Sequence, residues 1–480
     1  MFGWAILEKN IPFIVNFAFT IILARLVAPE MYGLVAMTAI LSALAQVMQG
    51  LGLNSALIQQ EQLGPDDTTT AFAVNLVIGS ALALLMAFSA GLIAQFFGRQ
   101  EVVTVVYANA LTLVFVAFGG VQTVMLQREY RFRAGLIIEM SATLLSGGAA
   151  IWLALEGYDL LALLGLMVIR QATQTLLLWV IVRWRPRGRV SLEAWRQLWG
   201  FGKHMVGASL YHHFATNLTS LLLGKFYSAT TLGLYGRAQS LQLLPVSLVT
   251  QPVQRVAFPL YSRSQSDRAA LRNLLRSHTR MIAPLAGLIA AGLSTGANEL
   301  IVILVGEAWI QAVPMLEVLG LAAFFNILFP LHSEANKAIG ASKWFFGIEV
   351  VKKTVLVICV ISGIYFGLNW LLLLLLFASL SDYVLSAMSS ARFLGYCWRQ
   401  QLEDVLPALV LTFFAIAIVK LSIIALPVGS LLLLTAVLKG GLILGVFAAG
   451  LLVVGAKAFP EIHVQAGRLL RRLPIGSAKP

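Results

Sequence analysis

Four basic side chains lie within or at the ends of long apolar stretches of this sequence. They are Arg25, Lys225, Arg237 and Arg255. An ionisable group inside a membrane span costs at least about 2.5 kcal/mol, so it usually faces a cavity or a partner. Arginine can hold phosphate oxygens through two parallel hydrogen bonds. The four cations are therefore candidates for holding an anionic ligand. The alternatives are that Arg25 and Lys225 extend to lipid headgroups and that Arg255 sets the topology.

Carboxylates in similar stretches are candidates for a site that binds a coupling ion. They are Glu139, Glu349, Asp382 and Glu317. Lys352 and Lys353 follow Glu349 by three and four residues, so a local ion pair on one helix face is the alternative there. Asp382 lies near the middle of its stretch and has no obvious partner on its own helix. It is therefore the stronger candidate for a proton or sodium site.

Polar residues around position 212 suit a ligand that is rich in hydroxyl groups. Tyr211, Thr216 and Asn217 lie near His212; the alternative is that their hydrogen bonds hold a crowded helix in place. The neighbours His212 and His213 diverge by about 100° on a helix, so we predict no metal site. The sequence has no GxxxxGK[ST] phosphate-binding loop. We therefore predict no cofactor and no ATP-driven pump, and no pattern of nucleophile and base indicates an enzyme.

The composition indicates an integral membrane protein. Of 480 residues, 59% are hydrophobic and 11% are charged, and the mean hydropathy is +0.86. Soluble domains carry about 45–50% apolar and about 25% charged residues. A soluble enzyme, a disordered chain and a nucleic-acid-binding domain are therefore excluded, in spite of a net charge of +13. Apolar runs of about 20 residues recur about fourteen times, which predicts an all-α protein with about 14 transmembrane helices.

Lysine and arginine gather in alternate loops and so predict the orientation. Basic residues recur within 128–133, 183–196, 263–280, 337–343, 392–399 and the tail from 457. Because cytoplasmic loops carry an excess of such residues, we predict that both termini are cytoplasmic. The loop 59–70 is the exception, since it is acidic and has no cation. Arg268, Arg272 and Arg276 recur every fourth residue, which favours a helix lying on anionic headgroups; a solvated basic linker is an equal alternative.

An internal repeat relates the two halves of the chain. Arg25 and Gly33 correspond to Lys225 and Gly233 at an offset of 200 residues. A second match, at an offset of 210, relates Arg133 and Glu139 to Lys343 and Glu349. Each half would contain six spans that begin and end on the same side of the membrane. Such a parallel repeat is a transporter architecture.

Four segments resemble a known family. They are ILARLVAPEMYGLVAM at 22–37, GLNSALIQ at 52–59, LGLYGRA at 232–238 and PVQRVAFPLYSR at 252–263. With these segments the chain resembles the polysaccharide transporter branch (Wzx-type, colanic-acid-exporter-like) of the MOP flippase superfamily, over essentially its whole length. The resemblance implies two six-helix lobes in a V around a central cavity, with two extra helices at the C-terminus.

That architecture divides the chain into five expected parts. They are an N-terminal lobe 1–183, a basic cytoplasmic linker 184–198, a second lobe 199–396, two additional transmembrane helices 397–456 and a basic cytoplasmic tail 457–480.

The resemblance also implies a cargo. It would be an oligosaccharide on undecaprenyl diphosphate, moved from the cytoplasmic to the periplasmic leaflet of the bacterial inner membrane by alternating access. The cations named above would then bind the diphosphate or an acidic sugar in the cavity, and the stripe around His212 would meet sugar hydroxyls. Partners would be membrane lipids and a polysaccharide polymerase with its export machinery, and not nucleic acid.

Three other functions stay open. A lipid II flippase would likewise need cations in its cavity. A MATE-type antiporter should place carboxylates deep in its cavity, where this sequence offers arginines. A membrane glycosyltransferase or polymerase would need a large periplasmic loop with catalytic residues, and no non-cytoplasmic loop here exceeds about a dozen residues.

Overall fold

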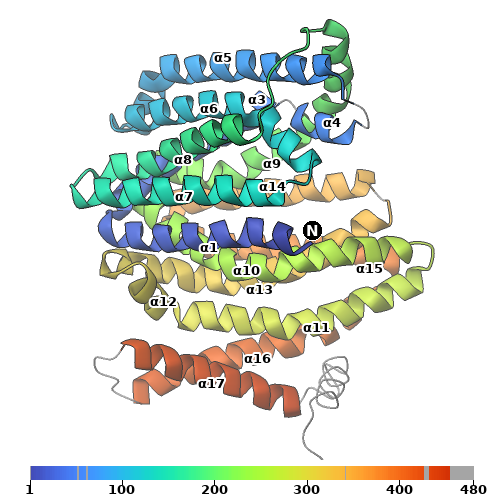
Figure 1. The fold of residues 1–480 in the computed structure, drawn as a ribbon. Helices are drawn as coiled ribbons and strands as arrows, with labels where there is room; N and C mark the ends of the chain where they lie inside the picture. Colours follow the sequence, from blue (N-terminus) through green and yellow to red (C-terminus); the bar gives the residue numbers. More distant parts are fainter. Residues whose placement is uncertain (1, 51–52, 61–62, 341, 426–431, 454–480) are drawn as a thin grey trace, which may run out of the picture. The chain divides into compact units, whose positions relative to one another are not determined.

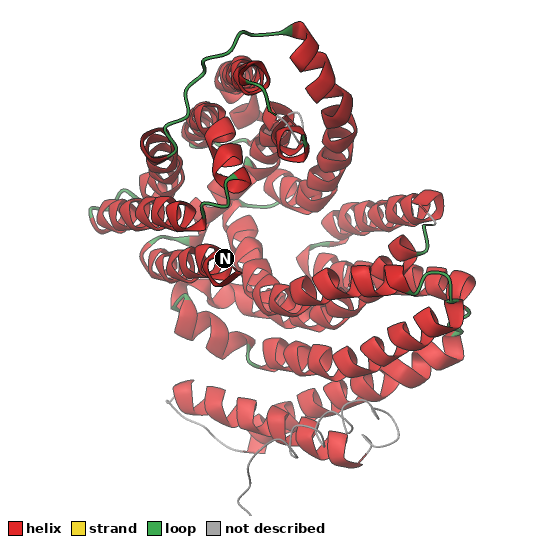
Figure 2. Cartoon of the chain, turned by 45° about the vertical axis from the view of Figure 1, so that its right-hand side comes forward, coloured by secondary structure: helices red, strands yellow, loops and turns green. Residues whose placement is uncertain are grey.

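The computed structural model describes residues 2–50, 53–60, 63–340, 342–425 and 432–453. Within the helices, the side chains at 2–10, 55, 201–209, 211–212, 215–216, 342–343, 423–425 and 452–453 are outside the described set. All regular structure in the described part is helical (Figure 2), which confirms the predicted all-α fold. The predicted tail 457–480 and both chain ends lie outside the described residues. Contacts divide the chain into two compact units, Met1–Gly236 and Arg237–Pro480.

The first unit contains nine helices and the start of a tenth. They are α1 (Phe2–Leu26), α2 (Pro29–Met37), α3 (Ala39–Gly50), α4 (Leu53–Gln59), α5 (Pro65–Phe97), α6 (Val102–Arg128), α7 (Phe132–Leu155), α8 (Asp159–Ile181), α9 (Leu192–Phe226) and the beginning of α10 (Ala229–Arg263). Helix α5 packs along α6, and α7 packs against both α8 and α1 (Figure 1). Helix α1 ends where Pro29 forces an extended Ala28, and the chain turns by 119° into α2.

The second unit contains the rest of α10 and the helices that follow it. They are α11 (Arg268–Thr295), α12 (Ala297–Leu304), the 3₁₀ helix η1 (Glu307–Ala312), α13 (Val313–Ala338), α14 (Ser342–Phe366), α15 (Leu368–Leu394), α16 (Trp398–Ala425) and α17 (Leu432–Val453). Helix α13 packs between α11 and α15 and is the most buried of the apolar helices among the described residues. Helices α16 and α17 lie side by side (Figure 1).

Helices occupy all fourteen predicted apolar stretches. Among the described residues, eight helices are long and apolar enough to cross a membrane, or up to ten if each of two bent pairs counts as one span. The chain is therefore a multi-pass membrane protein. The number of about 14 transmembrane helices stays a prediction, because the described residues account for eight to ten such helices.

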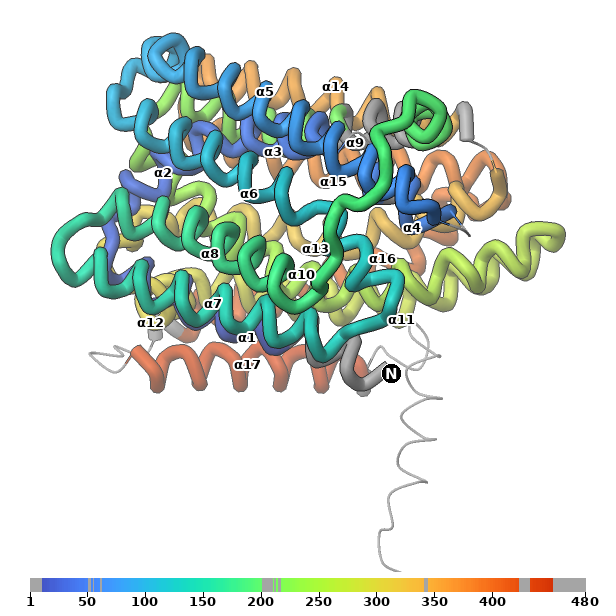
Figure 3. The backbone as a smooth tube through the Cα atoms, turned by 45° about the horizontal axis from the view of Figure 1, so that its top comes forward, coloured from blue at the N-terminus to red at the C-terminus, as the bar shows by residue number. Residues whose placement is uncertain are grey.

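The connection between α8 and α9 is shorter than the predicted linker 184–198. Helix α9 begins at Leu192, where the Ser191 hydroxyl accepts hydrogen bonds from the next turn. The preceding segment runs along the start of α5 (Figure 3). There the backbone N–H of Arg189 donates to Asp66 at 2.7 Å, and that of Gly188 donates to Thr69. The first turns of α5 thus hold this segment, and the carboxylates of Asp66 and Asp67 complement the positive end of the helix dipole. The five expected parts remain predictions.

Helix boundaries follow the repeat offsets. The break between α1 and α2 at 27–28 corresponds to the break between α9 and α10 at 227–228. Helices α7 and α14 begin at Phe132 and Ser342, which are 210 residues apart. Gly157 and Gly367, also 210 apart, both have positive φ angles just before or at the start of the next helix. The duplication inferred from a few residues therefore extends to helix ends and turns.

Candidate functional site

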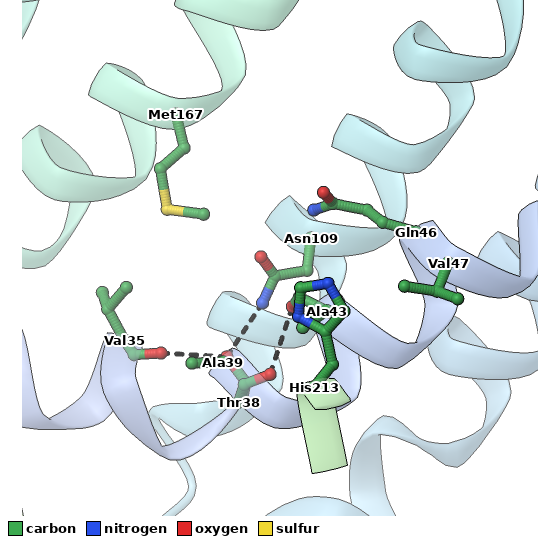
Figure 4. A pocket seen from close by; sticks show the side chains of 10 residues that line it. Val35, Thr38, Ala39, Ala43, Gln46, Val47, Asn109, Met167 and His213 are labelled. Carbon is green, nitrogen blue, oxygen red and sulfur yellow. Dashed lines mark hydrogen bonds between the residues drawn. The ribbon is translucent and has the colours of Figure 1, made fainter. Parts of the chain in front are cut away.

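A polar pocket of about 430 Å³ opens within the first unit (Figure 4). One wall of the pocket forms between α2 and α3. Helix α2 ends at Met37, Thr38 interrupts the helix, and α3 begins at Ala39. The lining residues come from α2, α3, α6, α8 and α9. They are Val35, Thr38, Ala39, Ser42, Ala43, Gln46, Val47, Asn109, Met167 and His213.

Hydrogen bonds fix one side of this pocket. The Asn109 side-chain amide on α6 donates to the Thr38 hydroxyl at 2.8 Å, and that hydroxyl donates to the Val35 carbonyl at 3.1 Å. Thr38 and Asn109 are almost fully buried, with 0% and 4% of their surfaces exposed. The Ser42 hydroxyl donates to the Thr38 carbonyl at 3.1 Å. Asn109 on α6 and Ser42 on α3 thus fix the position of Thr38 through hydrogen bonds.

His213 in this pocket neighbours the predicted stripe around His212. The side chain of His212 lies outside the described residues, as do those of Tyr211 and Thr216. Asn217 donates to the backbone carbonyl of His213 at 2.9 Å, one helical turn away. His213, on the same helix α9, lines the pocket, and the role of His212 stays a prediction.

The four predicted cations lie in different surroundings. Arg25 and Arg255 are exposed. Lys225 donates to the Phe96 carbonyl and lies 4.4 Å from the centre of the Phe96 ring. Arg237 is 8% exposed, and its guanidinium lies 5.1 Å from the centre of the Trp309 ring. None of the four is among the residues that line the pocket of the first unit.

Glu139 on α7 belongs to an interhelical network. It accepts from Arg170 on α8 at 3.1 Å and from Gln174 at 2.8 Å. Arg170 also donates to Asn16 on α1 at 3.0 Å. Sequence reasoning missed Arg170, although a cation in an apolar stretch was a usable signal. It lies one turn beyond Met167, which lines the pocket.

The other predicted ion-site carboxylates lie in the second unit. Glu349 accepts from Lys352 at 2.8 Å, which is the local pair that spacing suggested. Asp382 on α15 has no cation on its own helix nearby, yet Lys353 and Lys352 of α14 attract its carboxylate and Glu349 repels it. Glu317 is half-buried near the start of α13. Lysines of the neighbouring helix α14 therefore supply the positive charge near Asp382.

Asp404 on α16 is a buried carboxylate that pairs with two arginines. It was not singled out from the sequence. Arg276 and Arg280 of α11 donate to it at 2.7 and 2.5 Å, and the Tyr396 hydroxyl donates at 2.7 Å. The apolar face beside these arginines is buried, since Leu271 is 0% exposed. Of the three arginines in the repeating pattern, Arg276 thus pairs with α16, together with Arg280, while Arg268 is exposed.

A second clamp holds the last described helix. Lys439 on α17 donates to Glu299 on α12 at 2.6 Å and to the Thr295 carbonyl at 3.1 Å. The side chains of Lys439 and Glu299 are mostly buried. Ion pairs thus attach each of the two C-terminal helices to the second unit.

Arg99 connects the turn between α5 and α6 to α2. It donates to Glu30 at 2.6 Å and to Glu101 at 3.3 Å. The hydrogen bond from Arg99 lowers the pKa of Glu101 below its usual value. Within the described part of the chain, no group of three His, Cys, Asp or Glu side chains is placed to hold a metal ion.

Comparison with known proteins relates residues 22–314 to the family described as polysaccharide biosynthesis protein. The teichuronic acid biosynthesis protein TuaB of Bacillus subtilis is 27% identical over 68% of this chain and 69% of its own length. The succinoglycan biosynthesis transport protein ExoT of Rhizobium meliloti is 26% identical over 67% and 65%. The lipopolysaccharide biosynthesis protein WzxC of Escherichia coli is 24% identical over 62% and 61%. The matched regions thus span about two thirds of these relatives.

Solved structures show the same fold over a greater length. The lipid II flippase MurJ, in an inward closed conformation, matches with a TM-score of 0.72 over 94% of this chain and 98% of its own, at 14% identity. A multidrug MATE transporter of the MOP superfamily matches with a TM-score of 0.60 over 82% and 99%, at 13% identity. The chain therefore belongs to the polysaccharide biosynthesis protein family and has the fold of the MOP-superfamily transporters.

Proposed function

We propose that this protein is a flippase for lipid-linked oligosaccharides. It moves repeat units on undecaprenyl diphosphate from the cytoplasmic to the periplasmic leaflet of the bacterial inner membrane, for lipopolysaccharide, capsule or exopolysaccharide synthesis. The observation that carries this proposal is the likeness to a lipid II flippase over 94% of a chain whose family belongs to polysaccharide biosynthesis. The relatives named above give two further indications: ExoT is named a transport protein, and all three are named for the biosynthesis of teichuronic acid, succinoglycan or lipopolysaccharide.

The described side chains suit the parts of such a cargo. Arg25 and Arg255 are exposed and can reach diphosphate oxygens. Lys225 and Arg237 lie over aromatic rings, and their charges would add to the positive potential at the diphosphate. The neutral pocket of the first unit suits sugar hydroxyls. Alternating access of the two units would carry the sugar and diphosphate while the polyprenyl chain stays in lipid.

Asp382 remains our candidate for a coupling ion site, with Glu139, Glu349 and Glu317 as alternatives. Glu139 and Glu349 already accept hydrogen bonds from Arg170 and Lys352. Paired carboxylates of this kind argue against a MATE-type antiporter, which needs an acidic group open to its cavity. A polysaccharide polymerase that removes the product on the periplasmic side could also give transport its direction.

The proposal is tested in a strain that lacks the gene. Undecaprenyl-diphosphate-linked repeat units should accumulate on the cytoplasmic side, and surface polysaccharide should disappear. Mass spectrometry of extracted lipids measures the lipid-linked pool, and a glycosidase with access only to the periplasm shows on which side the repeat units lie. Surface polysaccharide is measured separately. Repeat units that reach the periplasm but stay unpolymerised would support a polymerase, and an unchanged lipid-linked pool would contradict the flippase.

Arg237→Ala tests the role of the buried cation within this function. Its contact with Trp309 is worth about 1–2 kcal/mol. We expect export to be abolished while the amount of protein in the membrane is unchanged, as judged by surface polysaccharide and immunoblot. Arg399→Ala, at a side chain that is 90% exposed, is the control. Normal export by Arg237→Ala would remove this residue from the transport mechanism.

A further inference from the structure

Polar and apolar side chains line the pocket in the first unit, and no charged side chain is among its described lining residues. Its polar side chains are two hydroxyls, two amides and one imidazole, and none of the lining residues is Asp, Glu, Lys or Arg. The volume of about 430 Å³ is within the usual range of ligand pockets, about 300–1,000 Å³.

Several hydrogen-bonding atoms in this pocket remain available for a ligand. The Asn109 amide nitrogen is used by Thr38, while its carbonyl oxygen points away from Thr38 into the pocket (Figure 4). Gln46 is exposed to the pocket, and its side-chain amide bonds no residue in the described ranges. The Ser42 hydroxyl donates to the backbone and keeps its lone pairs. A ligand therefore meets both donors and acceptors.

The interrupted helix at Thr38 is an independent sign of a site. Here the interruption lies directly on the pocket wall and is fixed by the almost fully buried Thr38 and Asn109. Side chains of α3 and α6 thus form hydrogen bonds at this interruption.

We propose that this pocket binds one uncharged sugar ring of the transported repeat unit, a hexose or an N-acetylhexosamine; this inference rests on the flippase function proposed above. Ring hydroxyls pair with Gln46, Asn109 and Ser42, and the C–H face of the ring packs on Val35 and Met167. An anionic ring fits poorly, because a carboxylate buried without a cation or sufficient donors is strongly disfavoured. Recognition of the diphosphate is then separate in space from recognition of this sugar.

Binding to the purified full-length protein in lipid nanodiscs tests the inference with three probes. They are farnesyl diphosphate, farnesyl diphospho-glucose and farnesyl diphospho-glucuronic acid. We expect the glucose probe to bind more tightly than farnesyl diphosphate, and the glucuronic acid probe to bind no more tightly than farnesyl diphosphate. If the glucuronic acid probe binds most tightly, the inference is wrong although the flippase function stands. If none of the three binds, the proposed function itself fails.

Two substitutions at Gln46 show whether the pocket is responsible. The change is mild, because Gln46 is exposed and holds no other element in place. Gln46→Ala should weaken the glucose probe about 2- to 10-fold, the effect of one neutral hydrogen bond, and leave farnesyl diphosphate unchanged. Gln46→Lys should tighten the glucuronic acid probe. Gln95→Ala, at an exposed glutamine on α5, is the control. An equal effect of Gln46→Ala on all three probes, or no effect on any, would overturn the assignment.

Discussion

Glu139 and Arg170 illustrate how single charges are accommodated within the membrane part of this protein. They lie on different helices, and each is about one third exposed. Gln174 and Asn16 provide further hydrogen bonds to the pair. Neutralisation across helices lowers the cost of both charges and ties α1, α7 and α8 together. The primary role that these contacts favour for Glu139 is structural.

We predict that Glu139→Gln destabilises the protein by about 1–2 kcal/mol, because Arg170 keeps its charge without its carboxylate partner. The additional change Arg170→Gln should restore part of this loss, since no uncompensated charge then remains. Thermal unfolding in nanodiscs measures both, with Glu129→Gln, in a more exposed pair, as the control. An unchanged unfolding temperature together with altered ion dependence of transport would instead make Glu139 an ion ligand.

At the scale of elements, the two repeats meet at a crossing of glycines inside the first unit. A Cβ atom at Gly33 on α2 would overlap the Ala229 carbonyl at the start of α10. A Cβ atom at Gly233 would overlap the Pro29 carbonyl at the start of α2. Each contact maps onto the other at the repeat offset of 200. The glycine pair found in the sequence therefore marks a close approach of equivalent backbones.

Gly33→Ala should destabilise the protein by about 1–3 kcal/mol and lower export, because the backbone it would strike cannot move independently. Gly236→Ala is the matched control: it lies on α10, and a Cβ there meets nothing within 4 Å. Unfolding temperature and surface polysaccharide are the measurements. Equal behaviour of the two variants would show that the crossing tolerates a wider separation of the helices.

For the whole molecule, the distribution of basic residues predicts which ends of the helices face the cytoplasm. The connection between α15 and α16 carries an exposed Cys397 between Arg392 and Arg399. The other cysteine, Cys359 on α14, is buried. The natural sequence therefore contains both a reporter and an internal control.

A membrane-impermeant maleimide should label Cys397 in inverted inner-membrane vesicles and leave it unlabelled in intact spheroplasts, because the positive-inside rule places this connection in the cytoplasm. Cys359 should stay unlabelled in both preparations. A Cys397→Ser variant identifies the labelled site. Labelling of Cys397 in intact spheroplasts would reverse the proposed orientation and place the termini in the periplasm.

Much of the helical framework could be predicted from the sequence, because apolar runs and breaks such as that before Pro29 are local properties. The repeat was also visible, since Gly33 and Gly233 are fixed by a close backbone contact and keep their spacing. The pocket was only partly predictable. His212 indicated helix α9, but Gln46 and Asn109 are ordinary polar residues in the sequence, and only the break at Thr38 brings them to one wall.

The sequence by itself determined that this chain is a duplicated, multi-pass helical protein, because hydropathy and charge act along the chain over the length of one span. Tertiary structure decided which charges are paired. Glu139 meets Arg170 31 residues away, and Asp404 meets Arg276 128 residues away. Such partners depend on how each helix is rotated against its neighbours. That rotation is set by the packing of side chains from several helices at once, which no single stretch of sequence contains.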